Sequence, residues 1–181
     1  MKIPRIFYQQ NRKVQEELQE LILDYEQKLL RVTAKDIKTV QKLSGKGREV
    51  GICLSVLYLV SNVDPNVGLG TDKRTLSDSS WQYFQQYAKN CGNVVYQLKR
   101  VRDLIDQNEI SNSHLSMMIY HLQQAYEAPQ QQPNQRQESE EDSLGLILQF
   151  VESAVMYLKM IKHLHGIKEE QFRTPAKKLN V

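Results

Sequence analysis

The sequence predicts an all-α protein in which a small helical bundle forms a head that caps an antiparallel two-helix coiled-coil stub. Two observations predict this arrangement. Long segments at both ends of the chain carry apolar residues every three or four positions, and shorter segments of the same period lie between them. No unit repeats at a fixed period, so the middle of the chain is expected to form one compact head.

Composition limits the protein class. The chain has 181 residues, of which 40% are apolar and 25% charged, as expected for one soluble globular domain with extensions. A net charge of +3 is too small to indicate nucleic acid by itself. Cys53 and Cys91 lack CxxC spacing, which favours a reducing compartment such as the cytoplasm. The N-terminus lacks a signal-peptide pattern, and the longest apolar run, at 52–60, is shorter than a membrane span needs, so no membrane contact is expected.

Residues 1–34 are predicted to form an N-terminal helix that pairs with one partner helix. The narrow apolar seam that predicts it consists of Val14, Leu18, Leu21, Tyr25, Leu29 and Val32. Thr33, with Asp36 three residues later, indicates a cap or kink. The Gly45-Lys46-Gly47 stretch indicates a break after it.

Residues 35–150 are predicted to form the helical head. Its first element, at 48–61, is apolar nearly all round, which favours a buried central helix, although its Val, Ile and Tyr content leaves a strand open. Further helices are expected at 79–90, 93–106 and 112–126, the last capped by Ser111 or Ser113 and stopped before Pro129. Residues 129–143 are rich in Gln and then acidic, which predicts a mobile loop.

Residues 151–181 are predicted to be the closing helix, whose first turn lies earlier, near Asp142 or Ser143. Its apolar stripe is Ile147, Phe150, Ala154, Leu158, Ile161 and His165. Pro175 is expected to perturb the helix near its end.

No pattern for catalysis, metal binding or cofactor binding stands out. The run GLGTDKRT at 68–75 has Asp72 where a phosphate-binding loop has Gly, and its charge would repel phosphate. His163 and His165 lie on different helix faces without a nearby Cys, while His114 and His121 are seven residues apart. We therefore expect no enzyme activity, no catalytic residues, no cofactor and no metal site.

A lysine stripe is the clearest functional signal. At about 100° per residue, Lys35, Lys38, Lys42 and Lys46 fall in a narrow sector of a helical wheel, and the apolar residues Ile37, Val40 and Leu43 lie roughly opposite. Such a stripe is most often a solvated face. The alternative is a contact with an acidic partner.

The order of the segments resembles the microtubule-binding domain at the tip of the dynein heavy chain stalk, over about residues 14–178. The matching motifs are Ala34-Lys35-Asp36-Ile37, Trp81, Asn93-Val94-Val95, Glu109-Ile110-Ser111 and Pro175-Ala176-Lys177. The chain departs from the family at Ser44-Gly45-Lys46-Gly47, where a Pro-Pro kink is usual. By this resemblance, 1–34 and 151–181 are the outgoing and returning stalk strands.

The resemblance implies binding to tubulin, whose surface and tails are acidic, in a cytoplasmic, cytoskeletal location such as a cilium or axoneme. The implied microtubule-binding residues are Lys35, Lys38, Lys42, Lys46 and Arg48 at one edge and Lys159 and Lys162 near another. Because the chain has no motor or ATP site, we expect a constitutive binder, with other cytoskeletal proteins as further candidate partners. The alternative is a helical adaptor that binds a protein partner other than tubulin.

Overall fold

The computed structural model describes residues 3–67, 78–129 and 138–173, and within these every regular element is helical. A 3-10 helix, η1 (Arg5–Gln9), precedes α1 (Arg12–Arg31) and α2 (Ala34–Gln41). Then come α3 (Arg48–Val60), α4 (Asp78–Tyr87), α5 (Cys91–Asp106), α6 (Asn112–Glu127) and α7 (Glu138–Arg173). The all-α prediction is confirmed, and residues 48–60 form a helix rather than a strand.

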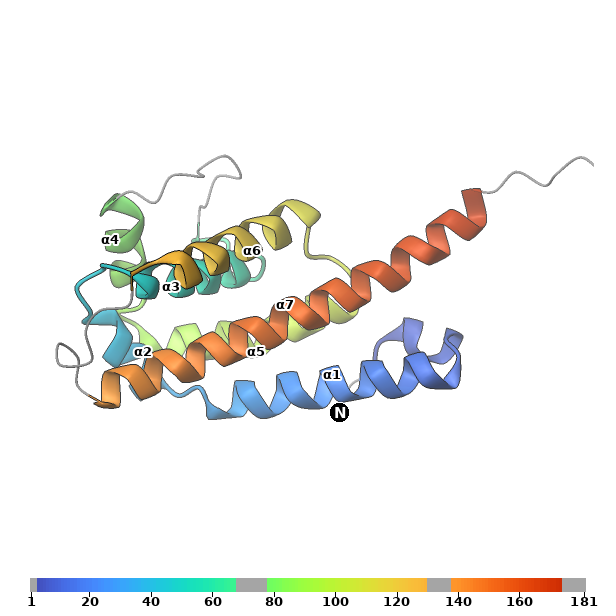
Figure 1. Cartoon of the computed structure of the whole chain (residues 1–181), viewed down its shortest axis with the longest axis horizontal. Helices are drawn as coiled ribbons and strands as arrows, with labels where there is room; N and C mark the ends of the chain where they lie inside the picture. Colours follow the sequence, from blue (N-terminus) through green and yellow to red (C-terminus); the bar gives the residue numbers. More distant parts are fainter. Residues whose placement is uncertain (1–2, 68–77, 130–137, 174–181) are drawn as a thin grey trace, which may run out of the picture.

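The two terminal helices, α1 and α7, run antiparallel along one another (Figure 1). Tyr25 of α1 packs its ring against Phe150 and Tyr157 of α7, with centroids 5.4 and 5.6 Å apart. The Ser153 hydroxyl donates to Asp24 over 2.6 Å. The α1 seam includes buried Ile22, while Leu21, which the sequence suggested, is only partly buried.

The head does not simply cap one end of this pair. Helix α5 packs on α7, and its Arg102 forms an ion pair with Glu26 of α1. The Tyr157 hydroxyl of α7 donates to Asp106 at the end of α5. Three helices therefore share one core along the paired segment, and the finer arrangement of a head on a two-helix stub is not confirmed.

Helices α3 and α6 form the other principal contact and lie side by side across α7 from α1 (Figure 1). Nearly every residue of α3 is buried, as its uniformly apolar sequence predicts. Gly51 permits the close approach, since a Cβ there would lie 2.3 Å from the backbone oxygen of His121. The apolar core is therefore continuous from α1 to α6.

Local capping signals explain several helix starts. The Thr33 side chain accepts from the Asp36 N–H, and Asp36 accepts from the Thr33 N–H, which is a complete capping box. Asn90 caps α5 and Ser111 caps α6 in the same side-chain-to-backbone manner. The predicted kink after residue 32 is therefore a true boundary between α1 and α2.

The start of α7 corrects the sequence interpretation. The loop predicted for 129–143 is wrong for its last six residues, which are helical from Glu138 onward, and residues 130–137 lie outside the described residues. The acidic residues Glu138, Glu140 and Glu141 occupy the first turn, where carboxylates interact favourably with the helix dipole. We call these three residues the acidic turn. The segments 68–75 and 175–177, which the sequence singled out, lie outside the described residues.

One described helix segment, Glu138–Gly166, is long and apolar enough by composition to cross a membrane; its most apolar 18-residue window has a mean hydropathy of 1.5. More than half of that window is buried within the protein. The core helix of a soluble protein has the same length and composition, so this feature is weak evidence for a membrane span.

Candidate functional site

The predicted lysine stripe lies on the outer side of α2. Lys35, Lys38 and Lys42 are exposed, while Ile37 and Val40 are completely buried against α5 and α7. Because α2 ends at Gln41, with Lys42 as its C-cap, Lys46 lies beyond the helix. The stripe is therefore two lysines within α2, a third at its C-cap and a fourth on the next loop. We call Lys35, Lys38, Lys42 and Lys46, together with Arg48, the basic edge.

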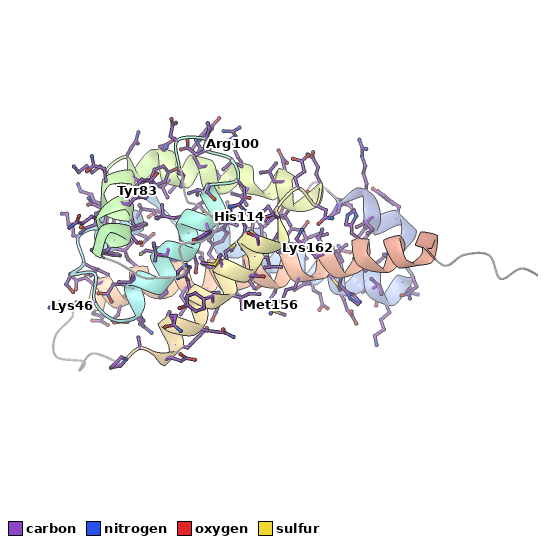
Figure 2. The ribbon with its side chains drawn as sticks, turned by 90° about the horizontal axis from the view of Figure 1, so that it is seen from above. Lys46, Tyr83, Arg100, His114, Met156 and Lys162 are labelled. Atoms are coloured by element: carbon purple, nitrogen blue, oxygen red, sulfur yellow. The ribbon has the colours of Figure 1, made fainter. Side chains whose placement is uncertain are left out.

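The loop that carries Lys46 is rigidly built. Gly45 and Gly47 have φ angles of +72° and +75°, which favour glycine. A Cβ at Gly45 would also lie 2.3 Å from the Trp81 ring. The buried carboxylate of Glu49 accepts from the Lys46 N–H over 2.9 Å. These contacts fix the Lys46 backbone, and its exposed side chain extends from one end of the molecule (Figure 2).

Arg48 differs from the four lysines. Its side chain is about one-third exposed and forms an ion pair with Glu141 of the acidic turn. None of the ion pairs within the described residues involves the four lysines. Arg48 therefore joins α3 to α7, whereas the lysines remain available to a partner.

Asp36 joins the start of α2 to the start of α7. It accepts from the Ser143 hydroxyl over 2.8 Å, as well as from Thr33. Although burial would raise the pKa of Asp36, hydrogen bonds from Thr33 and Ser143 lower it overall. This link holds the start of α7 beside the first turn of α2, while the Arg48–Glu141 ion pair holds it to the start of α3.

Lys159 and Lys162 are not part of this surface. They lie 16 and 19 residues after Ser143 on α7, which corresponds to about 24 and 28 Å along the helix. Figure 2 shows Lys46 and Lys162 well apart along the molecule. Lys159 is exposed, but Lys162 is partly buried, and its ammonium donates to Asn108 over 3.1 Å. Burial lowers the pKa of Lys162, so its contact with the loop before α6 is structural.

Sequence reasoning missed two carboxylates that shape the site. Glu49 is buried at the start of α3. The sequence feature that could have identified it is its position as a lone acidic residue in an apolar segment. Glu141 was assigned to a loop, and its pairing with Arg48 across 93 residues has no local signal.

The histidines that the sequence considered do not form a metal site within the described residues. His121 is buried and stacks on Tyr58, with ring centroids 5.3 Å apart. His114 contacts the Ser111 hydroxyl through Nδ1 over 2.7 Å. Both are packing residues of the α3–α6 contact.

Comparisons with known proteins do not extend this description. No family model, curated protein or solved structure matches the chain. The resemblance to the dynein stalk tip therefore remains a prediction from the sequence, and the basic edge is the structural feature that bears on function.

Proposed function

We propose that this protein is a non-catalytic binding module whose basic edge docks on an acidic protein surface, and that this surface is the microtubule. The observation that carries the proposal is the exposure of Lys35, Lys38, Lys42 and Lys46 at one end of the fold, without intramolecular ion pairs among the described residues. Several lysine-to-carboxylate contacts, each worth up to about 1 kcal/mol, together form a weak, reversible and salt-sensitive interface.

The rigidity of this end also supports a binding role. Cations held on a short capped helix and a hydrogen-bonded loop lose less conformational freedom on binding than cations on a flexible tail. The capping box at Thr33 and the Glu49 contact to the Lys46 N–H supply that order.

The choice of tubulin comes from the sequence resemblance. In this proposal α1 and α7 correspond to the outgoing and returning stalk strands, and the helices between them form the head. The antiparallel contact of α1 with α7 is compatible with that assignment. Because Arg102 and Asp106 of α5 bind both terminal helices, sliding of α1 along α7 would break buried polar contacts. We therefore expect constitutive binding in the cytoplasm, on the cytoskeleton, cilia and axonemes included.

Co-sedimentation with microtubules tests the proposal. We expect the protein to pellet with microtubules at low salt and to be released as salt rises, since screening weakens exposed charge contacts. The double variant Lys38→Glu/Lys42→Glu should bind about 30-fold more weakly, from a loss of about 2 kcal/mol. A matched control, Lys13→Glu/Lys99→Glu, reverses two exposed lysines outside the basic edge and should bind normally.

Two results would contradict the proposal. Equal pelleting of the Lys38→Glu/Lys42→Glu variant and the wild type would remove the basic edge from the interface. Absence of pelleting at every salt concentration would exclude microtubules and leave the helical adaptor as the better interpretation.

A further inference from the structure

One side of α1 exposes leucines instead of burying them. Leu30 is 76% exposed and Leu23 is 42% exposed. They are seven residues apart, which is about two helical turns, so both lie on the same side of the helix. The buried residues of α1 lie on other sides: Leu18, Ile22, Tyr25 and Leu29. Because α1 lies at the edge of the fold, the side with Leu23 and Leu30 is accessible to a partner (Figure 1). We call it the leucine face.

Two residues of opposite charge flank the leucines. Glu20 and Arg31 are exposed, and within the described residues neither takes part in an ion pair. At about 100° per residue they are only about 20° apart around the helix, so they lie along the same flank of the leucine face. Glu20 precedes Leu23, and Arg31 follows Leu30. The leucine face therefore carries a negative charge at one end and a positive charge at the other.

The other charges of this stretch are compensated within the chain. Between Glu20 and Arg31, the Lys28 ammonium binds Asp24 over 3.0 Å, and Glu26 forms an ion pair with Arg102 of α5. The first two turns of α1 add no net charge, because they contain two basic and two acidic residues: Arg12, Lys13, Glu16 and Glu17. Glu20 and Arg31 are therefore the charges that remain available beside the leucines.

A second copy of α1 that runs in the opposite direction is complementary to this face. The midpoint of Leu23 and Leu30 falls just after Glu26, and the midpoint of Glu20 and Arg31 falls just before it. The two midpoints are one residue apart, or about 1.5 Å along the helix axis. A single antiparallel register therefore places each Leu23 against Leu30 of the other copy and each Glu20 near Arg31 of the other copy.

Twofold symmetry fits this register. Rotation about an axis perpendicular to both helices brings the same flank of each α1 together, so the contact between Glu20 and Arg31 forms twice. Glu26 lies on the opposite flank near the axis, where its charge is already compensated by Arg102. Apolar residues at the centre of a helix pair and opposite charges beside them are the features that set partner and direction in coiled coils.

We propose that two copies of this chain associate through the leucine face, with their α1 helices antiparallel. Leu23 and Leu30 form the apolar centre, and Glu20 and Arg31 form two ion pairs between the copies. Each copy contributes one helix face, so the interface is small and the dimer is weak. Since α2 follows the C-terminal end of α1, the two basic edges lie toward opposite ends of the dimer. Self-association does not depend on the microtubule as the partner.

Analytical ultracentrifugation of the full chain tests the proposal. At low salt we expect the mass to rise from the 21.1 kDa of one chain towards twice that value as the concentration rises from about 1 to about 300 µM. Leu30→Ser removes apolar area from both copies and should weaken dimerisation by at least about 30-fold. The matched control, Met156→Ser, changes an exposed apolar residue on α7 and should have no effect.

Charge reversal tests the direction of the pairing. Glu20→Arg or Arg31→Glu alone places like charges together at both ends of the interface and should weaken dimerisation about tenfold. The double variant Glu20→Arg/Arg31→Glu exchanges the two charges and should dimerise like the wild type. The two single changes shift the net charge in opposite directions, so a general charge effect cannot weaken both. Glu109→Arg, at an exposed position between α5 and α6, is the matched control and should dimerise normally.

Three results would overturn the proposal. The mass of one chain at every concentration would exclude the dimer. A dimer that Leu30→Ser leaves unchanged would show that another surface pairs. Single charge variants that dimerise like the wild type, or a double variant that stays as weak as they are, would exclude the antiparallel register.

Discussion

The two main interhelical contacts of this protein are specified in different ways. Between α3 and α6 the contact depends on close approach: Gly51 faces the backbone of α6, and Ser55 donates to backbone oxygens of Gly51 and Met118. The buried His121 ring stacks on Tyr58, and neither of its nitrogens has a hydrogen-bond partner among the described residues. The contact between α3 and α6 is therefore specified mainly by how closely the two helix surfaces fit together.

The contact of α1, α5 and α7 instead surrounds buried charge. Arg102 is only 9% exposed and lies between Glu26 of α1 and Asp106 of its own helix. Tyr157 of α7 donates to Asp106, and the Tyr25 ring packs on Tyr157. Here charge pairing decides which residues meet, and removing one charge leaves the others uncompensated.

Because the two contacts are specified differently, different kinds of substitution should destabilise them. The α1–α5–α7 contact should be sensitive to a lost charge, whereas the α3–α6 contact should be sensitive to an added atom or an added proton. The following predictions test this difference, from the largest expected effect to the smallest.

Replacing Arg102 should cause the largest loss of stability. Arg102→Met keeps much of the volume but leaves Glu26 and Asp106 without their cation, at a cost of about 3 kcal/mol in the free energy of unfolding. Urea denaturation at neutral pH measures this loss. Arg100→Met is the control, since Arg100 is exposed and lies over the Tyr96 ring, and it should cost less than about 0.5 kcal/mol.

The pH dependence of the Arg102→Met variant sharpens this prediction. Burial already raises the pKa of Asp106, although Tyr157 and Arg102 oppose the shift. A group whose folded pKa is raised favours the folded state as it takes up a proton, so acidification toward that pKa should recover stability. The cost of Arg102→Met should therefore shrink as pH falls from 7 towards 4. A variant as stable as the wild type at pH 7 would refute the role given to this network.

Acid should destabilise the α3–α6 contact through His121. Burial lowers the pKa of His121 to about 4 from its usual 6.5. Between these values the unfolded chain binds a proton that the folded protein excludes, so stability falls as pH drops through this window, by about 2–3 kcal/mol in total. Denaturant titrations at several pH values measure the slope.

A substitution separates His121 from the other groups that titrate in this range. His121→Phe keeps a ring against Tyr58 but cannot take up a proton, so the slope between pH 6.5 and 4 should largely disappear. Burial also lowers the pKa of His114, which is less enclosed, so His114→Gln should change the slope less. An unchanged slope in His121→Phe would show that another group is responsible.

How far the sequence predicted these features depends on whether their causes are local. The Thr33–Asp36 capping box and the Ser111 cap depend on residues three positions apart, so their motifs were sufficient. The exposure of Lys35, Lys38 and Lys42 followed from helical period alone.

Features set by tertiary contacts were not predictable in this way. The burial of Arg102 has no local signal, because Glu26, its partner, lies 76 residues away. The Arg48–Glu141 pair was missed for the same reason, and with it the start of α7. The lysine stripe extended too far along a helix in the prediction, because α2 ends at Gln41. Lys162 was predicted to bind a partner, although its ammonium donates a hydrogen bond to Asn108.

The smallest expected effect compares two glycines inside helices. Gly51→Ala gains about 1 kcal/mol of helix propensity but forces a methyl group against the α6 backbone, an overpacking cost of about 2 kcal/mol. The net loss of about 1 kcal/mol should appear as a lower urea midpoint. In Gly145→Ala, no side chain or neighbouring element in the described part of the chain lies within 4 Å of the new methyl group on α7, so this change should stabilise by up to about 1 kcal/mol. Opposite signs for the two changes would establish close approach as the determinant of the α3–α6 contact, and stabilisation by both would refute it.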